Sequence, residues 1–88
     1  MFEAEYSKRF TKEFERFRKY DKETTAKIKI LIIDTLAHPT YGLGHPERLR
    51  HRKRNWGSRH IDHKNRLVYR IIGNVILFDA CYGHYDDH

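Results

Sequence analysis

Hydrophobic residues recur with two different periods in the first half of the chain. Residues 2–6 alternate apolar and polar side chains, a pattern that predicts a short strand. Between residues 8 and 20, Phe10, Phe14 and Phe17 recur at i, i+4 and i+7, which places them on one face of an amphipathic helix. A row of rings can stack on nucleic-acid bases, but at helical spacing it more often faces a protein core. We therefore interpret these phenylalanines as core residues.

The following segment predicts a second helix. Ser7 can cap the first helix, and Asp21 can cap a second one that runs to about Ala37. The apolar side of the second helix carries Ile28, Leu31, Ile32 and Leu36. Pro39 follows shortly after its predicted end, as is usual for a residue that cannot continue a helix.

Two β-rich runs near the end of the chain meet at Gly73-Asn74, a dipeptide typical of a two-residue hairpin turn. If Ile72 faces Val75, the expected pairs continue as Arg70 with Leu77, Val68 with Asp79, and Arg66 with Cys81. One face of the hairpin would then carry Leu67, Tyr69, Ile71, Ile76, Phe78 and Ala80. The other would mix Arg66, Arg70 and Asp79 with Val68, Ile72, Val75, Leu77 and Cys81.

Residues 56–62 predict another strand, joined to the hairpin by a short turn at residues 63–65. The expected pairs are Ile61 with Leu67, His60 with Val68, and Asp62 with Arg66. His60, Asp62 and Arg66 would then share the charged sheet face. The order of an N-terminal strand, two α-helices and a three- to four-stranded antiparallel sheet predicts an α+β fold with the helices on one sheet face.

The composition indicates one small basic domain over residues 1–88. Lys and Arg outnumber Asp and Glu by 18 to 12, for a formal net charge of +6, with seven further His. That balance favours a polyanionic partner such as nucleic acid or an acidic protein. The single cysteine and the lack of a signal-peptide pattern after Met1 make the cytoplasm the expected location. The longest apolar run, residues 30–33, is too short to cross a membrane, so no membrane partner is expected.

The most basic block covers residues 47–54 and contains one carboxylate, Glu47. RNA cleavage without a metal needs a base for the 2′-hydroxyl, an acid for the departing 5′-oxygen, and cations around the phosphate. Glu47 is a candidate base, or it simply relieves repulsion within the block. His84 is a candidate acid because an imidazole changes charge near neutral pH, or it is an ordinary surface histidine. Arg50 and Arg66 suit phosphate binding because guanidinium is planar and always charged.

Other chemistries fit the sequence less well. Cys81, His84 and His88 have workable ligand spacing, but a structural zinc site needs four ligands and there is no second cysteine. A strand cysteine is usually a small buried hydrophobe rather than a nucleophile. Tyr82 and Tyr85 can stack on a base. No metal or other cofactor is expected.

Four motifs in this order resemble the YoeB/Txe toxins of the RelE superfamily. They are residues 44–49 (GHPERL), 58–61 (SRHI), 63–69 (HKNRLVY) and 80–85 (ACYGHY). Residues 21–22 and 28–35 also fit, so the resemblance covers nearly the whole chain. It implies a RelE-like microbial-ribonuclease fold and a toxin of a type II toxin–antitoxin system, a metal-independent endoribonuclease that cuts mRNA in the ribosomal A site.

The resemblance also implies roles for individual residues. Glu47 corresponds to the general base, His84 to the general acid, Arg66 to the transition-state arginine, and Tyr85 to the tyrosine that follows the histidine. Arg50 stands where a lysine is expected. Glu47 and Arg50 are three residues apart and cannot share one face of a regular strand, so a strand end or a bulge is expected there. The residues expected to contact RNA are Arg48, Arg52, Lys53, Arg54, Arg59 and His60.

Two departures concern the edge of this site. His60 stands where an arginine is expected, which would make one phosphate contact weaker and dependent on pH. Asp86, Asp87 and His88 extend beyond a tyrosine that usually ends such chains, and two anions there would oppose RNA.

The implied partners are the 70S ribosome with its mRNA, an acidic antitoxin of the YefM/Axe kind, and a second copy of the chain in a homodimer. Two alternatives share the fold. One is a ParE-like inhibitor of DNA gyrase, which lacks an acid/base pair, and the other is a degenerate member that only binds RNA or its antitoxin.

Overall fold

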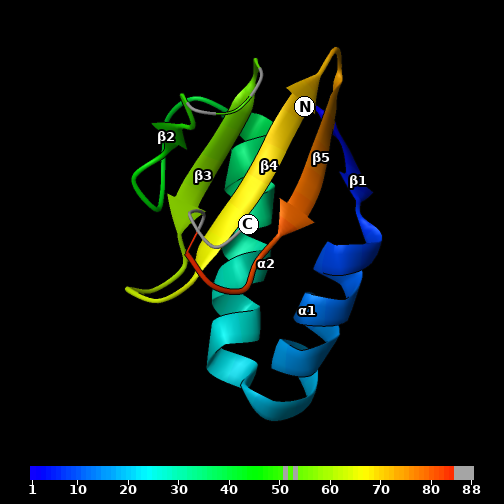
Figure 1. The fold of residues 1–88 in the computed structure, drawn as a ribbon, viewed down its shortest axis with the longest axis vertical. Helices are drawn as coiled ribbons and strands as arrows, with labels where there is room; N and C mark the ends of the chain where they lie inside the picture. Colours follow the sequence, from blue (N-terminus) through cyan, green and yellow to red (C-terminus); the bar gives the residue numbers. More distant parts are fainter. Residues whose placement is uncertain (51, 53, 85–88) are drawn as a thin grey trace.

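The computed structural model describes residues 1–50, 52 and 54–84. Along these residues the elements are β1 (Glu3–Tyr6), α1 (Lys8–Tyr20), α2 (Lys22–Ala37), β2 (Glu47–Arg48), β3 (Trp56–His60), β4 (Arg66–Ile72) and β5 (Val75–Ala80). The strands form one sheet in the order β1-β5-β4-β3-β2, with both helices on one side of it (Figure 1). The predicted α+β fold is confirmed.

The helix ends follow from local sequence. The Ser7 hydroxyl accepts from the backbone N–H of Phe10 at 2.9 Å, and an Asp21 carboxylate oxygen accepts from the N–H of Thr24 at 3.0 Å. Both side chains therefore satisfy N–H groups that the first turn of a helix leaves without a partner. The two helices begin and end where the sequence predicted. Within the described part of the chain, no helix is long and apolar enough to span a lipid bilayer.

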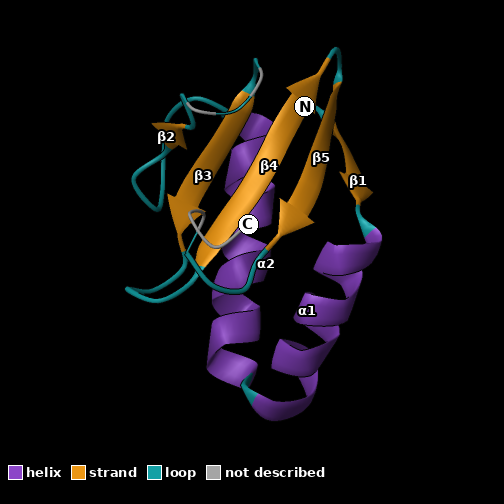
Figure 2. Cartoon of the chain, in the orientation of Figure 1, coloured by secondary structure: helices purple, strands orange, loops and turns teal. Residues whose placement is uncertain are grey.

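The N-terminal strand joins the sheet at its edge. β1 runs parallel to β5, with Glu3 opposite Val75 and Tyr6 opposite Phe78, whereas the other neighbouring strands are antiparallel. A parallel pair needs a long crossover connection, and here α1 and α2 lie in that connection. Because the crossover carries both helices to the same side, the opposite side of the sheet has no helix among the described residues (Figure 2).

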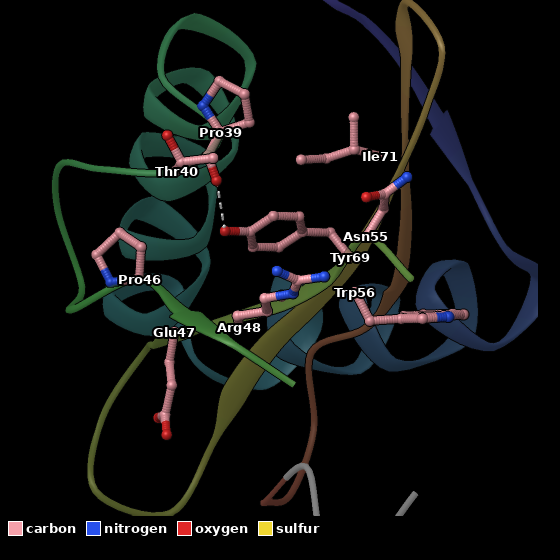
Figure 3. A pocket seen from close by; sticks show the side chains of 10 residues that line it. Pro39, Thr40, Pro46, Glu47, Arg48, Asn55, Trp56, Tyr69 and Ile71 are labelled. Carbon is pink, nitrogen blue, oxygen red and sulfur yellow. Dashed lines mark hydrogen bonds between the residues drawn. The ribbon is translucent and has the colours of Figure 1, made fainter. Parts of the chain in front are cut away.

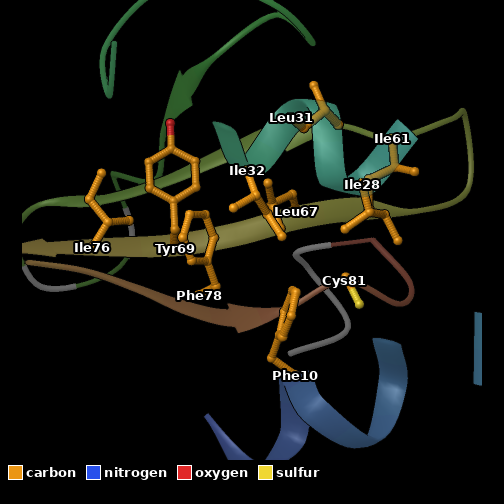
Figure 4. Close-up of a cluster of buried hydrophobic side chains, with 10 residues drawn as sticks. All are labelled: Phe10, Ile28, Leu31, Ile32, Ile61, Leu67, Tyr69, Ile76, Phe78 and Cys81. Carbon is orange, nitrogen blue, oxygen red and sulfur yellow. The ribbon is translucent and has the colours of Figure 1, made fainter. Parts of the chain in front are cut away.

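The main core lies between the sheet and the helices (Figure 4). Its buried members are Phe10, Ile28, Leu31, Ile32, Ile61, Leu67, Tyr69, Ile76, Phe78 and Cys81. Phe14 and Phe17 pack against this cluster, so the predicted phenylalanine stripe does face the core. A smaller cluster of Leu49, Val68 and Ala80 lies on the helix-free face, the sheet surface opposite the helices.

The β4–β5 hairpin keeps its predicted register only near the turn. Ile72 pairs with Val75 and Arg70 with Leu77, as predicted, but Val68 pairs with Ala80 rather than with Asp79. The register shift at Val68/Tyr69 leaves Asp79 as the extra residue of a β-bulge, which moves later residues to the other face. The predicted faces of Ala80 and Cys81 are therefore wrong: Ala80 packs on the helix-free face and Cys81 in the main core.

The β3–β4 pairing also differs from the prediction. His60 pairs with Arg66 and Ser58 with Val68, two residues away from the expected register. Asp62 lies in the connecting turn, where one carboxylate oxygen accepts from the N–H groups of Lys64 and Asn65, each at 2.8 Å. This carboxylate closes a longer turn than expected, so Asp62 is not paired on the sheet face. A shift of two residues preserves the faces, and His60 and Arg66 still share one.

Candidate active site

Three strands bring Glu47, His60 and Arg66 to the same end of the helix-free face. Glu47 of β2 pairs with Ser58, and His60 of β3 pairs with Arg66 of β4. Directly opposed residues project to the same side of a sheet, and so do residues two apart on a strand. β2 ends at Arg48, as expected from the three-residue spacing between Glu47 and Arg50.

His84 reaches this end of the sheet from the chain that follows β5. The backbone N–H of Arg66 donates to the carbonyl of Gly83 at 2.9 Å, so the residue before His84 is bonded to β4. The predicted hairpin register would have placed Cys81 opposite Arg66. Because the Asp79 bulge advances the chain by one residue, His84 comes closer to Arg66 than that register implies.

The imidazole of His60 lies among the other candidate residues. Partial burial lowers its pKa, and the charges of Arg66, His45 and His84 lower it further, while Glu47 opposes them. All four side chains are therefore close enough to His60 to act on its charge. Since the neutral imidazole is favoured, the RNA-binding role predicted for His60 would depend on acidic conditions or on the arrival of a phosphate.

His45 is a further member of this group, although no role for it was predicted from the sequence. Its ring centroid lies 5.6 Å from that of His60, and the N–H of His60 donates to the carbonyl of Gly44 at 2.6 Å, which holds the loop against β3. Its backbone φ of 52° lies in the left-handed region, uncommon for a residue other than glycine. The sequence feature that could have indicated a role for His45 is its place between Gly44 and Pro46, two residues before Glu47.

Arg66 is oriented by the turn that precedes it. Its Nη1 donates to the carbonyls of Asp62 at 2.6 Å and Asn65 at 3.1 Å, and the residue is only 7% exposed. Its Nε has no hydrogen-bond partner among the described residues. The guanidinium is thus held in place beneath the surface, unlike that of a solvated arginine.

The basic block forms a hollow lined by arginines. Leu49 is buried at 3% exposure and anchors the block on the sheet. Around it, Arg48, Arg50, Arg52 and Arg54 line a hollow of about 530 Å³. The guanidinium of Arg52 lies 4.6 Å from the centre of the Trp56 ring and 4.0 Å from the Asp79 carboxylate, so it makes a cation–π contact and an ion pair within the protein. Lys53 and Tyr85, both predicted site residues, lie outside the described residues.

A second hollow borders Glu47. Figure 3 shows Glu47 and Arg48 at its edge, with Pro39, Trp56 and Tyr69 among the other lining residues. The Tyr69 hydroxyl donates to the carbonyl of Pro39 at 3.0 Å, which ties the loop after α2 to the sheet. The carboxylate of Glu47 points away from this hollow, so the loop that leads into β2 supports the backbone of the candidate base and does not contact its carboxylate there.

Arg59 was predicted to contact RNA, and the structure shows otherwise. Its side chain is fully buried on the helix side of the sheet, where Nη1 donates to Asp34 Oδ2 at 2.5 Å. It also donates to the carbonyls of His38, Tyr41 and Leu43. The prediction for Arg59 is wrong because its neighbour His60, and not Arg59, points to the helix-free face.

Comparisons with known proteins identify the family of this chain. A family model described as "YoeB-like toxin of bacterial type II toxin-antitoxin system" matches residues 6–85. Toxin YoeB of Escherichia coli K12 is 42% identical over 65 residues, which cover 74% of this chain and 77% of that protein. The YoeB dimer of Staphylococcus aureus superposes with a TM-score of 0.87 at 29% identity, covering 96% of this chain and 98% of that one.

A heterotetrameric YoeB–YefM toxin–antitoxin complex from S. aureus contains a further similar chain. It has a TM-score of 0.84 and 29% identity, and the match covers 97% of this chain and 99% of that one. The family model alone matches well over half of the chain, and the solved structures match its fold over nearly its full length. This chain therefore belongs to the YoeB-like toxin family of bacterial type II toxin–antitoxin systems.

Proposed function

We propose that this toxin is a metal-independent, ribosome-dependent endoribonuclease that cuts mRNA in the A site. The observation that carries the proposal is the gathering of Glu47, His60 and Arg66 at one end of the helix-free face, where the N–H of Arg66 also bonds to Gly83, the residue before His84. A carboxylate, a fixed guanidinium and an imidazole are the groups that cleavage through the 2′-hydroxyl needs.

In this reaction Glu47 takes the proton of the 2′-hydroxyl, and the 2′-oxygen attacks the adjacent phosphorus. The bond from phosphorus to the 5′-oxygen breaks, and His84 gives its proton to the departing oxygen. Arg66 stabilises the negative charge that builds on the phosphoryl oxygens, supported by the carbonyls that hold its Nη1. The product carries a 2′,3′-cyclic phosphate, which water can open to a 3′-phosphate.

The remaining catalytic and binding roles belong to the basic block and the chain end. Arg50 and Tyr85 complete the proposed catalytic group, with Arg50 close to the phosphate and Tyr85 against a base. Arg48, Arg52, Lys53 and Arg54 would hold the RNA backbone, and the net charge of +6 favours a polyanion. The arginine-lined hollow around Leu49 supports this assignment for the residues that the structure describes.

The proposed protein partners follow from charge and from the relatives. A basic toxin is suited to an acidic antitoxin, and the S. aureus relative is described in complex with YefM. The other S. aureus relative is described as a dimer, which supports a homodimer here. Co-expression with the neighbouring small gene tests the antitoxin, since failure to copurify at moderate salt contradicts it.

The enzymatic proposal is tested by primer extension on programmed ribosomes. Loss of a general acid or base typically costs a factor of about 10²–10⁴ in rate, so Glu47→Ala and His84→Ala should each leave mRNA essentially uncut. Arg18→Ala serves as the control, because Arg18 is exposed on α1 and pairs with Glu15. Cutting at the wild-type rate by both site variants contradicts the assignment.

Expression of the chain in bacteria separates the alternatives. Intact mRNA together with a DNA-damage response on expression would favour a ParE-like gyrase inhibitor. Good expression without growth arrest would favour a member that only binds its partners.

A further inference from the structure

The short segment from Cys81 to His84 is held on both sides by side chains from distant parts of the sequence. Glu13 Oε1 of α1 accepts from the N–H of Cys81 at 2.8 Å and from the N–H of Tyr82 at 3.2 Å. Asn65 Oδ1 accepts from the N–H of Gly83 at 2.8 Å. The three consecutive backbone N–H groups before His84 are therefore all bound by side-chain oxygens.

Glu13 is itself well placed for this contact. Its other carboxylate oxygen accepts from Arg9 Nε at 3.1 Å, one helical turn earlier, and its side chain is only 16% exposed. One turn later on α1, the ring of Phe17 lies 6.2 Å from that of Tyr82. Helix α1 thus contacts the segment at two points, and hydrogen bonds to an ionised carboxylate are stronger than those to neutral acceptors.

Asn65 connects the same segment to Arg66. Its Nδ2 donates to Asp62 Oδ2 at 3.1 Å, and its backbone carbonyl accepts from Arg66 Nη1 at 3.1 Å. The backbone N–H of Arg66 in turn donates to the carbonyl of Gly83. A single turn therefore fixes the guanidinium of Arg66 and the residue directly before His84.

We propose that Glu13 and Asn65 are positioning residues that hold the imidazole of His84 in line with the leaving 5′-oxygen. This inference rests on the proposed function, because it requires His84 to act as the acid. Neither residue touches the RNA in this scheme, and each acts through the backbone of residues 81–83. A displacement of about 1 Å in a reacting group can cost roughly 10²-fold in rate, so the effect should appear in the chemical step.

The test measures single-turnover mRNA cleavage on programmed ribosomes. Glu13→Ala should lower the cleavage rate by about 10- to 100-fold and leave the affinity for ribosomes unchanged. Glu13→Gln should recover most of the rate, because its amide oxygen can still accept both N–H groups. Lys12→Ala, the adjacent exposed residue on α1, is the control and should cut like the wild type. Asn65→Ala is the second variant and should show the same loss as Glu13→Ala.

A second substrate distinguishes positioning of the acid from a general loss of structure. When sulfur replaces the bridging 5′-oxygen, the phosphorus–sulfur bond breaks and a thiolate leaves with the electron pair, without needing a proton from His84. Glu13→Ala and His84→Ala should then both cleave at close to the wild-type rate. A deficit of Glu13→Ala that persists on this substrate overturns the positioning role, and so does normal cutting of ordinary mRNA by Glu13→Ala and Asn65→Ala.

Failure of the proposed function has a different signature. If the wild type cuts neither substrate, the ribonuclease proposal is refuted, and the positioning role of Glu13 with it. If the wild type cuts and only the variants behave unexpectedly, the positioning inference alone is overturned. Amide hydrogen exchange at Cys81, Tyr82 and Gly83 provides a readout besides activity, because these amides should lose protection in Glu13→Ala and Asn65→Ala.

Discussion

The buried guanidinium of Arg59 leads to a quantitative prediction. It forms an ion pair with Asp34 at 2.5 Å and donates to the carbonyls of His38, Tyr41 and Leu43 in the loop after α2. Arg59→Met keeps much of the length of the side chain but removes the charge and every donor. The carboxylate of Asp34 then keeps the N–H of Leu43, at 2.9 Å, among the partners described here.

The magnitude follows from what remains buried. Removing one member of a buried ion pair costs about 3–5 kcal/mol, because the other charge stays uncompensated. The side chain of Asp34 is 21% exposed, so water can partly solvate it, and we expect the lower end of that range, about 3 kcal/mol. A native domain is stable by only about 5–15 kcal/mol, so the variant should be folded but weakened.

Urea unfolding followed by circular dichroism measures this loss. The midpoint should fall while the slope stays constant, and the melting temperature should drop by roughly 4–8 °C per kcal/mol for a domain of this size. Arg18→Met is the control, since its ion pair with Glu15 is exposed and its loss should leave the midpoint almost unchanged. A stability of Arg59→Met within about 1 kcal/mol of the wild type, together with weaker RNA binding, would refute the reasoning and restore the RNA-binding role.

Two further predictions concern the charges of the site. Burial, Arg66 and His45 lower the pKa of His60 from its ordinary value of 6.5, so below that pH the unfolded chain takes up a proton before the folded one does. The free energy of unfolding should therefore fall as the pH decreases from 6.5 toward the pKa of His60 in the folded state. Urea titrations at several pH values should show a smaller fall for His60→Gln than for the wild type. An equal fall in both proteins contradicts this prediction. In the basic block, Arg50→Ala/Arg54→Ala should reduce the slope of log affinity against log salt for single-stranded RNA by about 1.4, at roughly 0.7 per phosphate contact. Arg16→Ala/Lys19→Ala on α1 removes the same charge, and an equal change in that slope would show that net charge alone is responsible.

Much of the fold could be predicted because its signals are local. Helix α1 is defined by the Ser7 cap and a phenylalanine every three or four residues, and both depend only on neighbours within a turn. The hairpin turn at Gly73 has a positive φ of 58°, which glycine adopts without strain. The structure brings Glu47, Arg66 and His84 to one end of the sheet, in agreement with their expected grouping, while their catalytic roles stay predictions.

The errors arose where a residue's surroundings come from distant parts of the chain. Nothing near Arg59 in the sequence indicates that Asp34 and the carbonyls of the loop after α2 will surround its guanidinium. Because Arg59 lies in a stretch that matches the motifs of the toxin family, it was expected to contact RNA. His45 was missed for the same reason, because its importance comes from the ring of His60, fifteen residues away along the chain and 5.6 Å away in space.

The sequence by itself determined the helices, the hairpin turn and the residue types that the proposed chemistry needs, since each depends on local periodicity, capping or side-chain chemistry. The tertiary structure decided which face each side chain occupies near the site. The bulge at Asp79 is the clearest case, because its carbonyl accepts from the Ser7 hydroxyl at 2.7 Å, more than seventy residues away. One extra residue there turns Cys81 into the core and brings His84 toward Arg66, and strand periodicity alone cannot reveal such an insertion.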